Sequence, residues 1–341
     1  MKQAEQQILR QLVRGPKDFW QLITHQDASI KEFVDILNKL EEKKIIRKRN
    51  SVFSISEEGR TFIKPYLDSK CPCCEQGINL EGEFSFLREE FKKVAENRPL
   101  PRAEYDQGFM RRKDTVKRVI FMYERGDIER REIFILGDDD LLGLALGILN
   151  LHKRITIIEI DERVVTFIQK KIREYGFRDI EVLRGDVLKE FSPQLSSQFD
   201  TFVTDPPESE LGFKFFVRRC MEALKGRESV GYLGLTYLES SLRKWQQFEK
   251  FFLEANFVIT DILRDFSFYP EGKSYGDQWE NSYQSYRVFK ELKLPFPEKL
   301  WYRSSFVRFQ AVGEINLLPL PAIKSFKELY LDKETWATPD L

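Results

Sequence analysis

The chain has 341 residues, of which 42% are hydrophobic, and its 55 lysines and arginines equal its 55 aspartates and glutamates. This length suffices for two or three domains with a substantial core, and the balanced charge gives no support for a general affinity for nucleic acid or acidic partners. No signal peptide opens the chain and no apolar run approaches the ~18 residues of a membrane span, so we expect a cytoplasmic protein. The charged fraction of 32%, with only 4 methionines and 4 cysteines, suits a thermophile.

Residues 1–66 are predicted to form a winged-helix-like domain. Apolar residues with helical spacing come before Gly15-Pro16, which ends a first helix, and a second helix begins at Phe19. A third helix is predicted over 29–46, with a short hairpin and a helix start over 47–63. Three helices followed by a wing are typical of the winged helix-turn-helix fold.

This domain has two interpretations. The third helix and the basic wing at residues 47–49 could contact DNA. However, residues 1–66 contain 13 Lys+Arg against 9 Asp+Glu, and DNA phosphates would repel the acids of the third helix, such as Glu32 and Asp35. We therefore favour a structural role, in dimerisation or as a lid.

Residues 67–112 are predicted to be a connector that contains a CPCC turn. Cys71 and Cys74 have the spacing of half a zinc site, with Cys73 between them. A structural zinc normally needs four ligands, and no second closely spaced pair of Cys or His is present. The turn is either half of a zinc site completed across a dimer or a pair of reduced thiols.

An α/β pattern dominates residues 113–310. A buried strand over 133–136 is followed by a turn, an apolar helix over 141–149 and a second strand over 155–160. Helices and strands keep alternating to about Phe266, and residues 300–312 are predicted to supply two more strands. This pattern predicts a Rossmann-like, doubly wound sheet whose ligand lies beyond the carboxyl ends of its strands, followed by a C-terminal tail at 311–341.

The turn after the first strand carries Gly137 followed by Asp138, Asp139 and Asp140. Three carboxylates this close repel one another, so they need a cation, a metal or partial protonation to offset them. The amino end of the next helix supplies some positive dipole. A helix cap alone would need only one Asp, and we therefore expect this corner to hold something cationic.

Acids also follow the next strands. Glu159 and Asp161 end the second strand, where an acid can accept hydrogen bonds from ribose hydroxyls. Asp186 follows the third strand, where a carboxylate can accept from an adenine amino group. Each acid alone could be a helix cap, but together they predict a site for a nucleoside that carries a sulfonium.

The fourth strand ends in TDPPES. Pro206-Pro207 fix the backbone after Asp205 and would direct its carboxylate into the cleft. Such a turn can hold an amine by its N–H while the nitrogen lone pair faces the donor. The alternative is a rigid turn without chemistry.

Several of these motifs resemble known families. GDDD, IIEIDERVV, RGDV and FDTFVTD are similar to the corresponding motifs of spermidine and spermine synthases, which are aminopropyltransferases. DPP also resembles the turn of amino methyltransferases, but Glu208 replaces the aromatic residue that would stack on a flipped base. A winged-helix-like N-terminal domain, GDDD and DPPE together resemble the branched-chain polyamine synthases of thermophilic archaea and bacteria, over nearly the whole chain.

This resemblance implies aminopropyl transfer from decarboxylated S-adenosylmethionine to the central secondary amine of spermidine, with release of methylthioadenosine. It implies no metal and no cofactor besides this co-substrate, and we expect a homodimer. The acids agree with it, because they would repel the carboxylate of intact S-adenosylmethionine and attract the ammonium of the decarboxylated form. The residues expected to bind the donor are Gly137, Glu159, Asp161 and Asp186.

The acceptor amine must lose a proton, and a carboxylate near its ordinary pKa of ~3.9 is a poor base. We therefore expect repulsion within the aspartate cluster to raise one pKa. The residues assigned to catalysis are Asp138, Asp139, Asp140 and Asp205, with Asp139 or Asp140 as the leading candidates for the base and Asp205 orienting the amine. The residues expected to bind the polyamine are Glu208, Tyr237, Trp279 and Glu280, with Tyr283 as a further aromatic candidate.

Two other functions compete with this one. The chain could be a winged-helix DNA-binding regulator whose α/β domain senses a nucleoside or a polyamine. It could also be an S-adenosylmethionine-dependent methyltransferase acting on nucleic acid. We prefer the polyamine enzyme, because two acidic turns face one cleft, and nucleic acid is not an expected partner.

Overall fold

The structure is a computed structural model that describes residues 3–26, 28–63, 77–189, 192–269, 284–295, 300–320, 322–323 and 326–336. The CPCC turn lies outside these residues, as do Trp279, Glu280 and Tyr283, so the predictions made for them stay predictions. Within the described residues, no helix is long and apolar enough to cross a membrane.

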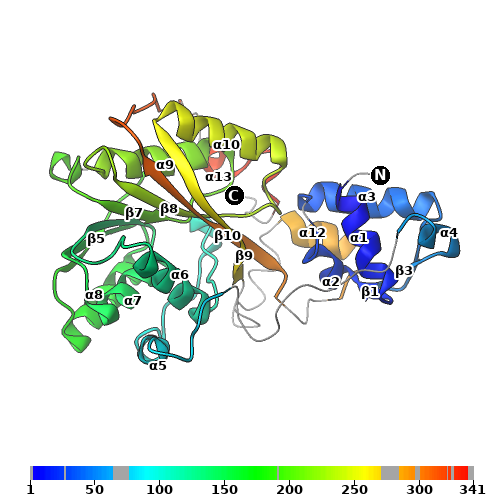
Figure 1. The fold of residues 1–341 in the computed structure, drawn as a ribbon, viewed down its shortest axis with the longest axis horizontal. Coiled ribbons are helices and arrows are strands. Elements are labelled where there is room, and N and C mark those ends of the chain that lie inside the picture. The colour runs from blue at the N-terminus through cyan, green and yellow to red at the C-terminus, as the bar shows by residue number, and fades with distance from the viewer. Residues whose placement is uncertain are drawn as a thin grey trace.

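The first part of the chain forms a small helical unit, which we call the N-terminal unit (residues 3–26 and 28–63; Figure 1). Its elements are α1 (Gln3–Val13), β1 (Lys17–Asp18), α2 (Phe19–Ile23), α3 (Ile30–Glu42), β2 (Ile46–Arg49), β3 (Val52–Ile55) and α4 (Glu57–Arg60). A capping box between Asp18 and Gln21 begins α2, and the Ser29 side chain caps α3. The strands pair in the order β1-β3-β2. These elements match the three helices and the hairpin that the sequence predicts.

The rest of the chain is built on a seven-stranded sheet with the order β6-β5-β4-β7-β8-β10-β9. The strands are β4 (Glu132–Leu136), β5 (Arg154–Glu159), β6 (Ile180–Arg184), β7 (Thr201–Thr204), β8 (Val230–Leu235), β9 (Phe257–Tyr269) and β10 (Tyr302–Ala311). The first five are parallel, and β10 runs antiparallel between β8 and β9. This mostly parallel sheet confirms the predicted α/β class.

One part of the strand prediction is wrong. The sequence predicts two strands over residues 300–312, but this segment forms the single strand β10, which pairs with β8 and β9 at the same time. Residues 302–311, YRSSFVRFQA, contain no Gly, Pro or Asn to turn the chain. With neighbours on both edges, the segment gains most hydrogen bonds by staying extended.

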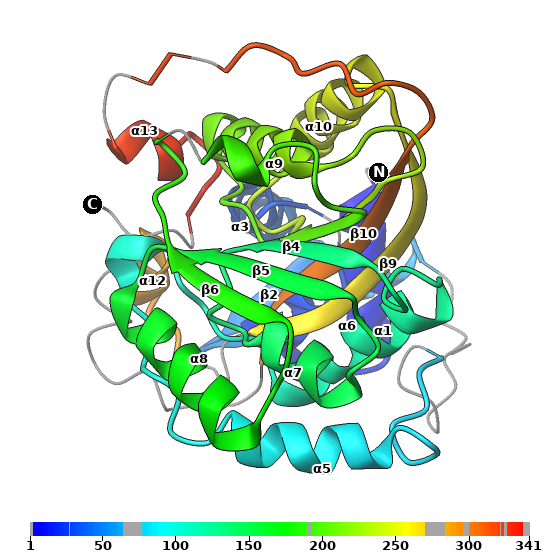
Figure 2. The same cartoon turned by 90° about the vertical axis from the view of Figure 1, so that its left-hand side faces the viewer.

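Helices cover both faces of the sheet (Figure 2). The helices are α5 (Ser85–Val94), α6 (Arg112–Glu124), α7 (Leu142–Leu149), α8 (Glu162–Tyr175), α9 (Glu210–Ala223), α10 (Leu242–Glu254), α12 (Gln284–Glu291) and α13 (Phe326–Tyr330), with short 3-10 turns at Ala103–Tyr105 and Pro193–Leu195. Helices α5 to α8 lie on one face, whereas α9, α10 and α13 lie on the other. Helix α12 packs instead against the N-terminal unit.

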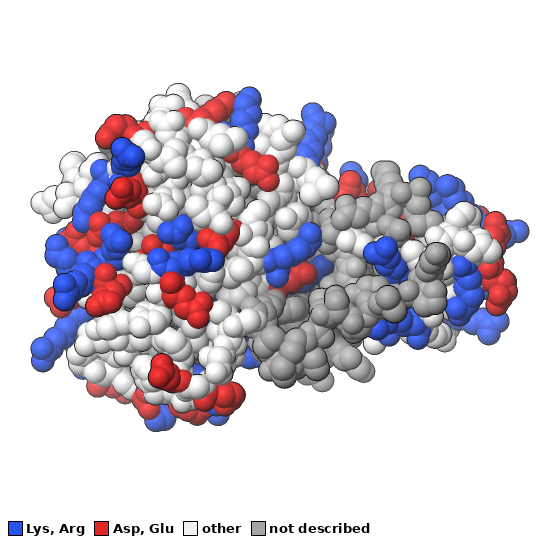
Figure 3. Space-filling model, viewed as in Figure 1, with Lys and Arg blue, Asp and Glu red and all other residues white. Residues whose placement is uncertain are grey.

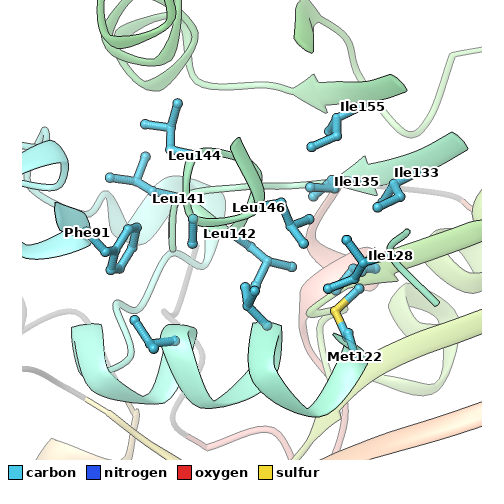
Figure 4. Close-up of a cluster of buried hydrophobic side chains, with 14 of the residues drawn as sticks. Phe91, Met122, Ile128, Ile133, Ile135, Leu141, Leu142, Leu144, Leu146 and Ile155 are labelled. Atoms are coloured by element: carbon cyan, nitrogen blue, oxygen red, sulfur yellow. The ribbon is translucent and has the colours of Figure 1, made fainter. Parts of the chain in front are cut away.

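Strand β4 lies at the centre of this core and is buried on both faces. Ile133 and Ile135 belong to the apolar cluster beneath α5 to α8 (Figure 4), and Phe134 and Leu136 belong to the cluster on the other face. This alternation is what a parallel strand covered on both faces requires. Helix α7 is apolar on all sides because it packs between the sheet and α5 and α6.

Charged side chains of both signs are interspersed on the face shown in Figure 3, over the sheet domain and over the N-terminal unit alike. Among the described residues on this face, the basic side chains form no uniform surface of the kind that binds a nucleic-acid backbone.

Candidate active site

A cleft opens at the carboxyl ends of β4, β5, β6 and β7. It lies where the strand order reverses between β4 and β7, which is where a doubly wound sheet binds its ligand. Its lining includes residues of all four acidic strand ends that the sequence singles out: Gly137, Asp139, Asp140, Glu159, Asp186, Asp205 and Glu208. A cleft therefore lies where the sequence predicts the site.

The first acidic turn begins at Gly137, whose φ of +74° lies in the left-handed region that favours glycine. The next residue, Asp138, does not line the cleft. Its carboxylate accepts the backbone N–H groups of Leu142 at 2.6 Å and Gly143 at 3.0 Å. Asp138 therefore serves as the acidic cap of α7, and only the other two aspartates face the cleft.

Asp139 and Asp140 differ in their partners. Asp140 is buried and accepts the backbone N–H of Met110 at 2.8 Å. Asp139 is half-buried, and its carboxylate accepts no hydrogen bond from the residues that the structure describes. Asp139 thus has its full capacity to accept bonds from a ligand.

Both carboxyl groups are poised to hold a proton. Burial, followed by the negative charge of Asp205, raises the pKa of Asp140 to about 7. Burial, followed by the charges of Asp140 and Glu159, raises the pKa of Asp139 well above its usual value. This agrees with the prediction of a raised pKa in the cluster, and a carboxyl group with a pKa of about 7 is able to exchange a proton at neutral pH.

At the end of β5, Glu159 is held by two backbone N–H groups. It accepts from Asp138 at 2.8 Å and from Asp161 at 2.9 Å, and burial raises its pKa. Asp161 lies outside the cleft lining. It begins α8 by accepting the N–H of Arg163 at 2.9 Å, and although burial opposes this, hydrogen bonds from Arg163 hold the pKa of Asp161 below its usual value.

Asp186 follows β6 and lines the cleft between Gly185 and Val187. One of its carboxylate oxygens accepts the N–H of Leu188 at 3.0 Å, which fixes the turn. The other oxygen accepts no hydrogen bond within the described part of the chain. Glu159 and Asp186 thus place two acceptors along the side of the cleft where the sequence predicts a nucleoside.

The second acidic turn begins at Asp205, which is held by a buried arginine. Arg118 is 2% exposed, and its Nη1 donates to both carboxylate oxygens of Asp205, at 2.7 and 2.9 Å. Asp205 also accepts from the Tyr269 hydroxyl at 2.8 Å and from the Gly234 N–H at 2.9 Å. Its carboxylate is thus fixed by four contacts and balanced by a cation, while its side chain remains 31% exposed to the cleft.

Glu208 lies at the other end of this turn, in an acidic part of the cleft that we call the acceptor end: Asp106, Glu208, Glu239 and Tyr302. Within the described residues, Glu208 accepts a single hydrogen bond, from the Thr236 N–H at 3.3 Å. Burial, followed by the charges of Glu239 and Asp106, raises its pKa well above the usual value. The Tyr302 hydroxyl donates to Glu239 at 2.5 Å, and burial raises the pKa of this phenol so that it keeps its proton.

Tyr237, a predicted polyamine contact, does not line the cleft. Its ring stacks on Trp245, with centroids 4.3 Å apart, and the Arg264 guanidinium lies 4.3 Å from its centre. The faces of this ring are therefore covered by protein, which leaves no room for a substrate cation on them.

Sequence reasoning missed several lining residues. Tyr269 ends β9 and Tyr302 begins β10, whereas Glu239 lies between β8 and α10 and Asp106 lies before α6, and none of these segments carries a motif. Arg118 lies beneath the cleft. A weak signal exists for Arg118, because it stands with Lys117 among the apolar residues Val116 and 119–122, where a buried charge needs a partner.

Together these groups suit a reaction between two cationic molecules. Carboxylates at both ends of the cleft can bind ammonium groups, and the half-buried Asp139 can take a proton. Among the described residues, no group of three or more His, Cys, Asp and Glu side chains is arranged to hold a metal ion.

Comparison with known proteins gives a consistent result. Residues 87–337 match the family model described as the branched-chain polyamine synthase A C-terminal domain. The N(4)-bis(aminopropyl)spermidine synthase of Methanocaldococcus jannaschii is 35% identical over 94% of this chain and 91% of its own length. That of Thermococcus kodakarensis is 34% identical over 96% and 92%.

A similar solved structure is that of the branched-chain polyamine synthase C9 mutein from Thermus thermophilus, in complex with N4-aminopropylspermidine and 5′-methylthioadenosine. It superposes with a TM-score of 0.86 at 29% identity and covers 98% of this chain and 93% of its own. The similarity therefore extends over both the N-terminal unit and the sheet domain.

Proposed function

The chain belongs to the branched-chain polyamine synthase family, and on this premise we propose that it is an aminopropyltransferase. It transfers the aminopropyl group of decarboxylated S-adenosylmethionine to the central secondary amine of spermidine. The products are a branched polyamine and methylthioadenosine, the two kinds of molecule found together in the related Thermus structure.

The observation that carries this proposal is the uneven bonding of the acids in one cleft. Asp138 and Asp205 are engaged by the protein itself, whereas Asp139 and the Glu208 side chain retain most of their capacity to bind a ligand. An anionic or neutral substrate would leave these carboxylates uncompensated in a partly buried site. A donor and an acceptor that both carry ammonium groups compensate them.

The same charges select the donor. The aminopropyl chain of decarboxylated S-adenosylmethionine ends in an ammonium, which Asp139 and Asp140 attract. The intact molecule adds a carboxylate next to that amine, which the same two residues repel. At an effective dielectric constant of 20, unit charges 4 Å apart interact by about 4 kcal/mol, which is enough to discriminate strongly between the two.

The chemical step is a displacement at carbon. The central nitrogen of spermidine, once deprotonated, uses its lone pair to form a bond to the methylene carbon next to the sulfonium. The carbon–sulfur bond breaks, its electron pair moves to sulfur, and neutral methylthioadenosine leaves. The new ammonium then passes its remaining proton to a carboxylate or to water.

We assign the base to Asp139, with Asp140 as its neighbour that holds the pKa high, and we assign the orientation of the amine to Asp205. Gly137, Glu159 and Asp186 form the nucleoside side, and Glu208 binds an ammonium of the acceptor. Asp138 and Asp161 support the site by capping α7 and α8. Trp279 and Glu280 remain proposed polyamine contacts from outside the described residues.

The test is to incubate the purified protein with spermidine and with either decarboxylated or intact S-adenosylmethionine, and to identify the products by mass spectrometry. We expect methylthioadenosine and a branched polyamine from the decarboxylated donor alone. Absence of product from both donors would refute the proposal, and a methylated polyamine or nucleic acid from the intact donor would favour a methyltransferase.

We also propose that the N-terminal unit is a winged-helix domain, supported by its element order and its three-stranded sheet. The proposed domains are 1–66, a connector at 67–112, a catalytic domain at 113–310 and a tail at 311–341.

We propose a homodimer, tested by sedimentation at several concentrations. We propose a cytoplasmic enzyme, tested by cell fractionation, because its charged co-substrates do not cross membranes unaided.

A further inference from the structure

The acceptor end of the cleft lies against the N-terminal unit, although the two are far apart in sequence. Glu239 and Tyr302 line the cleft, and each has a chain neighbour, Leu238 and Arg303 respectively, that contacts the N-terminal unit. The groups that face the acceptor and the groups that hold the N-terminal unit are therefore consecutive residues on the same two segments.

Arg303 makes the first of these contacts. Its side chain is 4% exposed and donates from Nη1 to the Ile23 carbonyl at 2.9 Å and from Nη2 to the Gln26 carbonyl at 2.8 Å. Its Nε donates to Asp265 of β9 at 2.6 Å. One guanidinium thus ties β9 and β10 to the loop between α2 and α3, in a geometry that needs the fork of an arginine.

The second contact is between main chains. The N–H of Ile30, the first residue of α3, donates to the Leu238 carbonyl at 2.8 Å. The start of α3 thus fixes the residue immediately before Glu239. A helix start has N–H groups without partners in its own helix, so this bond satisfies a group that would otherwise need water.

Thr236 joins both contacts to the cleft. Its buried hydroxyl donates to the Arg303 carbonyl at 2.6 Å and accepts the Leu238 N–H at 3.1 Å. Its own backbone N–H donates to the Glu208 carboxylate at 3.3 Å. A continuous chain of hydrogen bonds therefore runs from the N-terminal unit, through Arg303, Leu238 and Thr236, to the acids of the acceptor end.

Apolar packing makes this junction rigid. Leu238, Phe289 and Trp301 belong to the same buried cluster as the core of the N-terminal unit. Trp20 contacts both Phe289 and Trp301, with ring centroids 4.8 and 5.1 Å apart, and its Nε1 donates to the Pro295 carbonyl. The N-terminal unit and the acceptor end therefore share one core, and a shift of one is transmitted to the other.

We propose that the N-terminal unit positions the acceptor end of the cleft, with Arg303 and Thr236 as the positioning residues that connect the two. This inference rests on the proposed function, because it takes Glu208, Glu239 and Tyr302 as the groups that bind the polyamine. No comparable contact joins the described part of the N-terminal unit to the lining formed by Gly137, Glu159 and Asp186. Loss of the connection therefore weakens acceptor binding and spares the donor side.

The main test uses the matched pair Thr236→Val and Thr236→Ser. Valine keeps the shape of threonine but removes the hydroxyl and both of its hydrogen bonds, whereas serine keeps the hydroxyl. We expect Thr236→Val to raise the KM for spermidine on the order of tenfold. The KM for the donor and the Kd for methylthioadenosine should stay within about twofold of wild type, and Thr236→Ser should restore most of the acceptor affinity.

A second pair tests the N-terminal side of the connection. Ile30→Pro removes the N–H that bonds to Leu238, at a helix position that accepts proline and after a residue, Ser29, with an extended ψ of 160°. Ile30→Val trims the same buried side chain but keeps the N–H, and is the control. We expect a several-fold rise in the spermidine KM for the proline variant relative to the valine variant.

The outcomes separate the inference from the proposed function. If wild type makes no branched product, the function fails and the inference fails with it. If wild type is active but Thr236→Val and Ile30→Pro keep the wild-type spermidine KM, only the inference fails. Equal losses for donor and acceptor would also overturn it, because they would show a general effect on folding. Methylthioadenosine affinity and thermal melting of each variant confirm that it is folded.

Discussion

The two acidic turns of the cleft treat their carboxylates differently. In the turn after β4, Asp138 receives two backbone N–H groups, Asp140 receives one, and Asp139 receives none from the described residues. In the turn after β7, Asp205 receives an arginine, a tyrosine and a backbone N–H, whereas Glu208 receives one long bond. Each turn therefore combines a carboxylate fixed by the protein with one left for a ligand.

The contrast shows that carboxylates of one cluster can have different roles: some are held by hydrogen bonds from the protein, and others are left to interact with a ligand. A carboxylate with several donors stays in one orientation, so it can orient an amine but is less able to take a proton. A carboxylate with none keeps a high pKa until a cation or a proton reaches it. The two turns also differ in their compensating charge. Arg118 forms a direct ion pair with Asp205, whereas the charges of Arg98 and Arg118 lower the pKa of Asp140 without outweighing its burial.

The largest effect is expected from Asp139→Asn. This change removes the carboxylate that accepts no hydrogen bond from the described residues. Because a positioned general base contributes about 10²–10⁴-fold to the rate, we expect kcat to fall by at least two orders of magnitude. Methylthioadenosine release in a stopped assay measures this loss. Asp138→Asn is the matched control on the neighbouring residue.

We expect Asp138→Asn to act on stability more than on rate. The new amide cannot accept both helix N–H groups, so it should lose about 1–2 kcal/mol of unfolding free energy while kcat falls by less than about tenfold. Chemical denaturation and steady-state kinetics together test this difference. Equal rate losses for the two variants would contradict the division of roles within the first turn.

The second-largest effect is expected from Arg118→Met, which acts on Asp205 in the turn after β7. It leaves Asp205 without its buried cation, and because Asp205 is partly exposed we expect a loss of about 1–3 kcal/mol rather than the ~3–5 kcal/mol of a fully buried pair. We expect kcat/KM to fall about 100-fold, since the carboxylate loses its fixed orientation. Arg118→Lys, which keeps the charge but loses the Nε and Nη2 bonds to Ser267 and Tyr269, should lie between wild type and Arg118→Met. Unchanged kinetics in Arg118→Met would contradict the role of Arg118 in fixing Asp205 for the reaction.

A smaller and more selective effect is expected from Glu208→Gln at the acceptor end. Removing this negative charge should raise the spermidine KM about tenfold, which corresponds to about 1.4 kcal/mol. The affinity for methylthioadenosine, measured by calorimetry, should not change. A loss of nucleoside affinity with an unchanged spermidine KM would place Glu208 on the donor side and contradict the assignment.

The smallest change in rate is expected from Asp140→Asn, which instead alters the pH dependence. The negative charge of Asp140 contributes to the high pKa of Asp139, second only to burial. Without this charge the pKa of Asp139 falls, so the acid limb of the kcat/KM profile should move to lower pH. A limb that stays in place would show that another group titrates.

Asp140→Asn is also expected to make the unliganded protein more stable than wild type at neutral pH. The pKa of Asp140 is about 7 in the fold against an ordinary value of 3.8. The folded state therefore holds this proton more tightly than the unfolded chain, and wild type loses stability as the pH rises from about 4 to 7. Asp140→Asn avoids this loss, so its advantage should be nearly absent near pH 4 and reach at most about 4 kcal/mol at pH 8. Thermal melting across this pH range measures it.

Much of the site could be predicted because its acids follow strands. Buried runs such as residues 133–136 locate the strands, and parallel strands bring their carboxyl ends to one edge, so GDDD and DPPE had to meet. What could not be predicted is which acid the protein itself would bond. The three aspartates are identical in residue type, and no motif reveals that Asp138 bonds the Leu142 and Gly143 N–H groups or that Leu141 adopts a φ of +58°.

Partners distant in sequence were also beyond prediction. Arg118 on α6 reaches Asp205 from 87 residues earlier, and Tyr269 at the end of β9 reaches it from 64 residues later. The assumption of two strands over 300–312 hid this arrangement, since it separates Tyr302 from the cleft. Motifs at strand ends thus locate a site, whereas the residues that hold its carboxylates come from segments distant in sequence.

The most direct measurement is the crystal structure of the protein with methylthioadenosine and spermidine bound. We predict that the central nitrogen of spermidine lies within hydrogen-bond reach of the Asp139 carboxylate, at ~2.6–3.2 Å, while Arg118 still holds Asp205. A central nitrogen bound to Asp205 with Arg118 displaced, or one remote from both acidic turns, would contradict the division of the two turns into fixed and free carboxylates.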